Sequence, residues 1–236
     1  MWKAGVSPEA VLQGRISFGT RVRWNAIQKL LARDPLGVVL DIGSGKSVLW
    51  GFAVERCVIW VNLDLQIDRP QLDCIGDGIW WIEADGQKLP IRGNSVDTVF
   101  LISVLEHFDS SHAALDEVRR VIKPKGRIVL TVPREPRPFF LYEPDLVRLG
   151  HARFGYREDE IVGHLSGFEV EALGYAFHLP GQVGWELSHA FNRRYSQSLG
   201  WRILYKALLL LEDQYSVYGV GNEIVVVARE FKSGAP

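Results

Sequence analysis

Short runs of apolar residues alternate with longer amphipathic stretches along most of the chain. Five such runs are rich in β-branched residues and nearly continuous in apolar character: Gly37 to Ile42, Val58 to Leu63, Ile79 to Glu83, Val96 to Ile102 and Arg127 to Val132. Continuous apolar runs of this length are typical of strands that are buried on both faces. The alternation therefore predicts an α/β fold, with a mostly parallel sheet covered by helices on both faces.

Apolar residues recur at the helical period between and after these runs. The predicted helices cover residues 21–32, 113–122 and 157–165. We expect the second helix to begin near Asp109 to Ser111, and Pro124 and Gly126 to turn the chain into the next strand. Four prolines from Pro133 to Pro144 predict a loop, and further strands are expected from Gly167 and over Asn222 to Arg229.

The length and net charge of the chain limit the number of domains and the kinds of partner that we expect. The chain has 236 residues and a formal net charge of −1, so bulk charge gives no reason to expect a nucleic-acid partner. We expect a single domain over residues 1–236, with an N-terminal helical cap at 1–35 and an aromatic-rich helical insertion at 180–218. The insertion lies between the last two predicted strands.

The two cysteines and the apolar segments predict a cytoplasmic protein. Cys57 and Cys74 lack metal-ligand spacing, so we expect two ordinary thiols in a reducing compartment and no metal site. The first five residues contain no apolar core of a signal peptide, and Ala207 to Leu211 is too short to span a bilayer. We therefore expect neither a signal peptide nor a transmembrane segment.

Three acidic residues follow three successive predicted strands. Asp41 ends the first strand, Asp64 ends the second and Asp85 follows the third. Ligands of open α/β sheets bind outside the carboxyl ends of the strands, so these carboxylates should line one crevice. Gly43 and Gly45 lie in the first turn, where glycine allows a tight backbone and close approach of a ligand. The pattern predicts a nucleotide or nucleoside site.

Two phosphate-binding motifs are excluded by single positions. A dinucleotide fingerprint needs glycine at position 48, where Val48 stands. Gly45-Lys46-Ser47 imitates the end of a phosphate-binding P-loop, but that loop needs glycine where Leu40 stands. Asp64 lies 19 residues beyond Gly45, a spacing at which a carboxylate accepts both ribose hydroxyls. A nucleoside site without a phosphate requirement remains, although Asp64 as a helix cap is the alternative.

Six stretches match a known pattern in order and spacing: Val38 to Gly45, Val61 to Asp64, Glu83 to Pro90, Asn94 to Val99, Ser103 to Phe108 and Val121 to Arg127. Together they resemble the class I S-adenosylmethionine (SAM)-dependent methyltransferases, in particular the branch with the ubiquinone and menaquinone methyltransferases. The resemblance implies a Rossmann-like three-layer sandwich with strand order 3-2-1-4-5-7-6, the last strand antiparallel.

The resemblance also implies SAM as cofactor. Its binding site would comprise Asp41, Gly43, Ser44, Gly45, Asp64, Leu65, Asp85, Gly86 and Ser103. Asp41 would lie near the ammonium group, Asp64 would hold the ribose and Asp85 the adenine amino group. The family usually has a third glycine where Ser47 stands. The neighbouring Lys46 either meets the methionine carboxylate or, as we favour, points to solvent.

The acceptor side is less defined. His107 is either a general base or a packing residue at a helix start; histidine titrates near neutral pH, which suits a base. His151, Arg153 and Tyr156 either contact substrate or begin a solvated helix. A helix from Trp201 to Leu211 could be plain packing, a substrate lid, a homodimer face or a membrane-surface contact.

Together these features predict methyl transfer from SAM to a small-molecule or lipid-linked acceptor. The alternatives are a non-catalytic binding or regulatory subunit with the same fold and, less favoured, a nucleotide-binding NTPase.

Overall fold

The computed structural model describes residues 17–31, 33–45, 49–67, 78–141, 143, 145, 147, 150–190 and 199–231. Within them, one sheet has the strand order β3-β2-β1-β4-β5-β7-β6. Strand β7 runs antiparallel to β5 and β6, and the other described pairs are parallel. The predicted fold class and strand order are confirmed.

The strands are β1 (Gly37–Ile42), β2 (Cys57–Asp64), β3 (Ile79–Glu83), β4 (Val96–Ile102), β5 (Ile122–Pro133), β6 (Phe168–Ala176) and β7 (Glu223–Glu230). The helices are α2 (Phe18–Leu30), α3 (Trp50–Ala53), α4 (Ser111–Val121), α5 (Glu158–His164), α6 (Leu179–Ala190) and α7 (Leu199–Gln214), with short 3₁₀ turns η1 (Val54–Arg56) and η3 (Leu105–His107).

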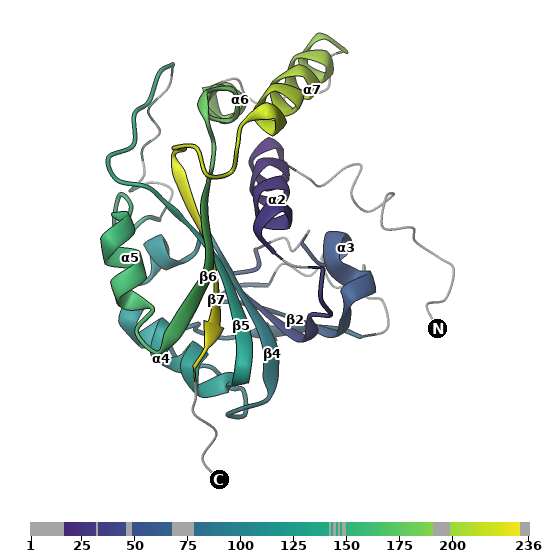
Figure 1. Cartoon of the computed structure of the whole chain (residues 1–236), viewed down its shortest axis with the longest axis vertical. Helices are drawn as coiled ribbons and strands as arrows, with labels where there is room; N and C mark the ends of the chain where they lie inside the picture. The colour runs from purple at the N-terminus through teal and green to yellow at the C-terminus, as the bar shows by residue number, and fades with distance from the viewer. Residues whose placement is uncertain are drawn as a thin grey trace.

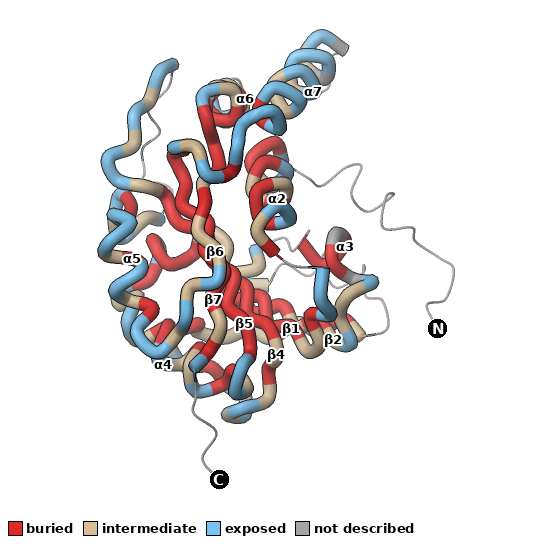
Figure 2. The backbone as a smooth tube through the Cα atoms, in the orientation of Figure 1, coloured by how far each residue is buried: buried red, intermediate tan, exposed pale blue. Residues whose placement is uncertain are grey.

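Two hydrophobic clusters cover the two faces of the sheet. Helices α4 and α5 pack on one face and α2 and α3 on the other (Figure 1). Alternation along β1 sends Leu40 and Ile42 to the α4 side and Val39 to the α2 side. Buried residues are accordingly concentrated in the strands (Figure 2).

The junction of α4 and β5 differs from the prediction. We expected Pro124 and Gly126 to lie in a turn before the strand, but β5 begins at Ile122, directly after α4. The turn is absorbed inside β5: Lys125 has a φ of 64°, and the register with β4 shifts between Val96 and Thr98. An extra-residue bulge changes the direction of a strand without ending it, which explains the difference.

Helices α6 and α7 lie beyond the carboxyl ends of the parallel strands, at the end of the molecule where the loop after β5 also emerges (Figure 1). They cover most of the predicted insertion; residues 191–198 and the first part of the predicted N-terminal cap lie outside the described residues. Much of α7 is exposed or half-buried (Figure 2).

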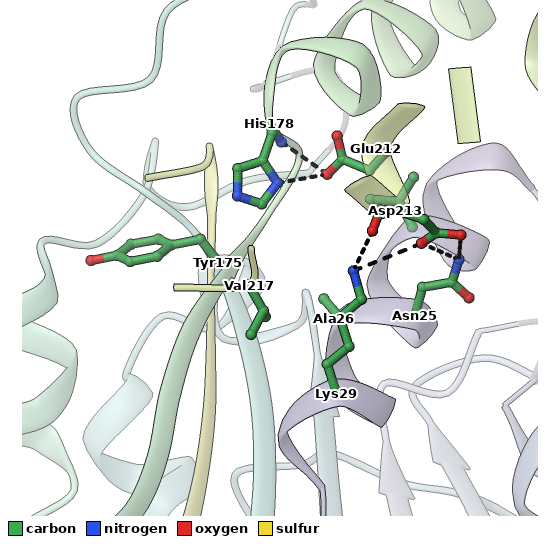
Figure 3. Close-up of a pocket in the computed structure, with 9 residues that line it drawn as sticks. Asn25, Ala26, Lys29, Tyr175, His178, Glu212, Asp213 and Val217 are labelled. Carbon is green, nitrogen blue, oxygen red and sulfur yellow. Dashed lines mark hydrogen bonds and ion pairs between the residues drawn. The ribbon is translucent and has the colours of Figure 1, made fainter. Parts of the chain in front are cut away.

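Glu212 holds α7 against the start of α6 (Figure 3). Its buried carboxylate accepts bonds from the His178 backbone N–H at 3.0 Å, from His178 Nδ1 at 3.0 Å and from the Gly181 N–H at 2.8 Å. The adjoining cavity measures about 10 Å³, which is room for one water molecule and not for a cofactor.

Cys57 is half-buried and forms no disulfide with another described residue, and Cys74 lies outside the described residues. Among the helices that the structure describes, none is both long enough and apolar enough to cross a bilayer.

Candidate active site

The turn after β1 contains two glycines with different surroundings. Both have a positive φ, 67° at Gly43 and 52° at Gly45, a region that side chains disfavour. A Cβ on Gly43 would lie 2.1 Å from Val104 Cγ2, whereas a Cβ on Gly45 would meet no atom of the described residues within 4 Å. Gly43 is therefore required by packing against the end of β4, and Gly45 borders open space.

Two buried polar atoms near this turn have no hydrogen-bond partner among the described residues. They are Asp41 Oδ2 and Ser44 Oγ. Asp41 is 1% exposed, and burial, followed by the charge of Asp64, raises the pKa of its carboxyl well above the usual value. An orphaned buried carboxyl next to open space is expected where a cationic ligand supplies the missing partner.

Asp64 joins the glycine turn to the end of β2. Its Oδ2 accepts the Gly45 N–H at 2.8 Å, and its Oδ1 accepts the Gln66 N–H at 3.3 Å. A carboxylate offers about four lone-pair sites, so two remain for a ligand. Leu65 follows it and is 62% exposed.

Asp85 and Gly86 occupy the corresponding place after β3. Asp85 Oδ1 accepts the Gln87 N–H at 2.8 Å, which orients the carboxylate. A Cβ on Gly86 would lie 2.7 Å from Phe108 and 2.8 Å from Ile42, so glycine is required there. Because β1, β2 and β3 are neighbours in the sheet, the three acidic residues line one edge, as predicted from the topology.

The residues after β4 belong to a buried ionic network. Ser103, with a φ of 50°, donates to Glu223 Oε1 at 3.0 Å, and Arg23 donates to the same oxygen at 2.6 Å. Burial alone would raise the pKa of Glu223, but the charge of Arg23 outweighs it and leaves the pKa lowered. The Ser103 side chain thus has an internal partner.

Glu106, His107 and His151 form a cluster in which one ligand-type atom of each lies within 4.8 Å of the others. His107 Nδ1 lies 2.9 Å from the Gly150 carbonyl oxygen, and the two imidazole rings meet at 4.6 Å. Glu106 Oε2 and His151 Nδ1 are buried without a hydrogen-bond partner in the described residues. Burial raises the pKa of Glu106 to about 8 and, with the nearby His107, lowers that of His151 to about 4.

Arg153 and Tyr156 are committed to contacts within the chain. Arg153 pairs with both oxygens of Glu160, at 2.7 and 2.9 Å, and its guanidinium lies 3.8 Å from the centre of the Tyr156 ring. Tyr156 is fully buried and donates to the Leu105 carbonyl oxygen at 3.0 Å. Of the three predicted acceptor contacts, only His151 lies in the cluster with His107. Lys46 and Ser47 fall outside the described residues.

Four charged residues near the site were missed from the sequence: Arg23, Glu106, Arg137 and Glu223. Glu106 stands inside a family-like stretch, so its position was available as a signal. Nothing in the sequence marks the other three, because their significance arises from contacts between segments up to 200 residues apart.

Comparisons with known proteins agree with this geometry. A family model described as a methyltransferase domain matches residues 40–130. The chain is 30% identical over 146 residues to the demethylmenaquinone methyltransferase of Thermus thermophilus, covering 57% of this chain and 66% of that protein. It is 32% identical over 114 residues to the malonyl-(acyl-carrier protein) O-methyltransferase of a Marinomonas species, covering 44% of this chain and 42% of that protein.

The fold has solved counterparts. A SAM-dependent methyltransferase from Mesorhizobium loti superposes with a TM-score of 0.62 at 17% identity, covering 91% of this chain and all of that one. The curated relatives are matched over only 42% and 66% of their own length. The strand order, the motifs at the strand ends and these matches support a class I SAM-dependent methyltransferase, similar to the branch with the ubiquinone and menaquinone enzymes.

Proposed function

We propose that this chain transfers the methyl group of SAM to a small-molecule or lipid-linked acceptor. The observation that carries the proposal is the pair of orphaned polar atoms, Asp41 Oδ2 and Ser44 Oγ, beside the open space at Gly45. A nucleoside that bears an ammonium group fits these residues, because the cation gives the buried Asp41 carboxylate a partner.

The other acidic residues fit the rest of the cofactor. Asp64 keeps lone pairs that can accept the two ribose hydroxyls while it holds the Gly45 turn in place. Asp85, fixed by the Gln87 N–H, would accept the adenine amino group, and the Gly86 backbone would lie at the ring. When bound, SAM supplies an electrophilic methyl group on a sulfonium sulfur that is already a good leaving group.

In this proposal, His107 would act as the base for a hydroxyl acceptor. A carbonyl oxygen can only accept, so the contact with Gly150 assigns the ring proton to Nδ1 and leaves the Nε2 lone pair free in the neutral ring. The His107 side chain is exposed, so an acceptor can reach it. Nε2 would take the hydroxyl proton as the acceptor oxygen bonds to the methyl carbon and the carbon–sulfur bond breaks, giving S-adenosylhomocysteine.

The surroundings support an acceptor that is at least partly apolar. Helix α7 exposes Ile203, Leu210 and Leu211 by 54% or more, at the end of the molecule that holds the carboxyl ends of the parallel strands. The two curated relatives are named for acceptors of different chemistry, a menaquinone precursor and a malonyl group on a carrier protein. The proposal therefore covers an acceptor atom that is oxygen, carbon or nitrogen, and a catalytic base is needed only when the acceptor is a hydroxyl.

Titration calorimetry with SAM and S-adenosylhomocysteine tests the proposal. We expect both to bind, and Asp64→Ala to weaken binding by about tenfold or more, because charge-assisted hydrogen bonds are lost. Asp116→Ala, an exposed change on α4, is the matched control and should leave affinity unchanged. If folded protein gives no binding heat with either ligand, the proposal is wrong. Thermal stabilisation by ATP with magnesium but not by SAM would favour an NTPase.

A methyl-transfer assay distinguishes an enzyme from a non-catalytic binding or regulatory subunit. Binding of SAM and S-adenosylhomocysteine without methyl transfer to a panel of phenol, carboxylic acid and quinol acceptors would favour a binding or regulatory subunit.

A further inference from the structure

Arg137 is a half-buried guanidinium that forms no ion pair with the residues that the structure describes. It lies in the loop after β5, with its guanidinium carbon 4.5 Å from the centre of the Trp185 ring and 5.2 Å from that of Phe139. Its Nε is buried and has no hydrogen-bond partner, and Arg137 forms no ion pair within the part of the chain that the structure describes. The aromatic rings hold the cation but provide no lone pair for its five N–H groups.

Three carboxyl groups are near enough for their charge to act on Arg137, but none forms an ion pair with it among the described residues. Burial raises the pKa of Glu106 to about 8, which favours its neutral form. Glu223 is paired with Arg23 at 2.6 Å. Glu186 accepts the backbone N–H groups of Phe140 and Leu141 and the side-chain amide of Gln182. The buried Nε of Arg137 has no hydrogen-bond partner among the described residues, and a buried donor of this kind points to a partner that is not among them.

Arg137 follows the end of β5, and His107 follows the end of β4, the neighbouring parallel strand. Its charge is among the influences on both Glu106 and His151, the two partners of His107 in the cluster. Trp185 comes from α6, at the end of the molecule where the parallel strands have their carboxyl ends (Figure 1). The cation therefore lies at the edge of the sheet at which an acceptor would meet the base and the methyl group.

We propose that Arg137 binds an oxyanion of the methyl acceptor, either a carboxylate or a phosphate. This inference rests on the proposed function, because it assigns the acceptor to the crevice beside His107. The planar guanidinium fork matches both oxyanions and binds them in bidentate fashion, while Trp185 and Phe139 keep it oriented before the ligand arrives. The acceptor would thus be an acidic molecule, anchored by its anion and methylated at another group.

Calorimetry on the protein saturated with S-adenosylhomocysteine tests the proposal, using malonate and inorganic phosphate as probes. We expect saturable binding of at least one of them, weakened about tenfold or more by Arg137→Gln and less by Arg137→Lys, which keeps the charge but loses the fork. The matched control is Arg134→Gln in the same loop, whose Nε donates to the Gly221 carbonyl oxygen at 2.7 Å. The stronger probe distinguishes a carboxylate from a phosphate.

The outcomes are separable. Absence of anion binding, or equal affinity in the wild type and Arg137→Gln, would overturn this inference while S-adenosylhomocysteine binding stays intact. Failure of S-adenosylhomocysteine to bind would instead overturn the proposed function. If Arg137→Gln does not fold, the wild type decides: dimethyl malonate, the uncharged ester, must bind at least tenfold more weakly than malonate, and equal binding would contradict the proposal.

Discussion

Replacing either glycine of the β1 turn with alanine separates packing from ligand access. Gly43→Ala places a Cβ 2.1 Å from Val104 Cγ2 and 2.8 Å from Val104 Cβ, at a φ of 67°. Gly45→Ala, at a φ of 52°, places its Cβ in open space. The first change should therefore destabilise the fold, and the second should mainly obstruct the cofactor.

The size of the effect follows from two contributions. Left-handed backbone costs roughly 1–2 kcal/mol for a residue with a Cβ, and overpacking typically adds about 1–3 kcal/mol. We expect Gly43→Ala to lower the free energy of unfolding by about 2–5 kcal/mol and Gly45→Ala by about 1–2 kcal/mol. Val104→Ala, which removes two methyl groups from a buried side chain, should cost about 2 kcal/mol.

Urea unfolding of the wild type, Gly43→Ala, Val104→Ala and the double variant measures the free energy that the steric overlap of the new Cβ with Val104 costs. Because Val104→Ala removes the atom nearest to the new Cβ, the double variant should be more stable than additivity predicts by about 1–3 kcal/mol. Gly45→Ala should show no such coupling with Val104, yet it should weaken S-adenosylhomocysteine binding. Additivity of Gly43→Ala and Val104→Ala within about 0.5 kcal/mol would refute the packing explanation.

Three further predictions concern titratable residues. The pKa of Asp41 is raised in the folded state, so its ionisation lowers the stability of the fold as pH rises above the pKa of the unfolded state. Asp41→Asn should therefore raise the melting temperature of the cofactor-free protein at pH 8 while weakening S-adenosylhomocysteine binding. A lowered melting temperature would contradict this prediction. Burial alone would lower the pKa of His178, but its bonds to Glu212 and the Gly219 carbonyl outweigh burial and raise it. The protonated His178 ring therefore stabilises the fold below its usual pKa of 6.5, and this stabilisation is lost as pH rises through the pKa of the folded state. His178→Gln should flatten the fall in melting temperature between about pH 6 and pH 8. An unchanged slope of melting temperature against pH would contradict the stabilising role of the His178–Glu212 pair. His107→Gln should lower kcat by about 10²–10⁴-fold on a hydroxyl acceptor with cofactor affinity unchanged, and EDTA should have no effect; loss of activity with EDTA would point instead to a metal ion in the cluster.

The sheet was predictable because its central strands are buried on both faces. Strands β1, β3 and β4 have the same bounds as the apolar runs that predicted them. The positions of Asp41, Asp64 and Asp85 at one edge followed from topology alone, since parallel strands bring their carboxyl ends together. The start of β5 was not predictable, because a bulge with a positive φ at Lys125 replaces the turn that Pro124 and Gly126 suggested.

The acceptor side shows where sequence reasoning ends. His151 and Arg153 are two residues apart in one stretch and were given the same predicted role. In the structure, His151 meets His107, while Arg153 pairs with Glu160 and covers Tyr156. Which partner each side chain finds depends on the tertiary positions of η3 and α5, and no local pattern encodes that choice.

The place of β7 in the sheet affects how the protein can be synthesised. The final strand lies between β5 and β6, so β6 has no partner on that side until Glu223 to Glu230 have left the ribosome. Before then, β5 and β6 present open edges that favour aggregation. The same strand carries Glu223, which positions Arg23 and Ser103. A nascent chain can therefore pair its first three strands early, but the ionic network of Glu223, Arg23 and Ser103 forms only after β7 has left the ribosome.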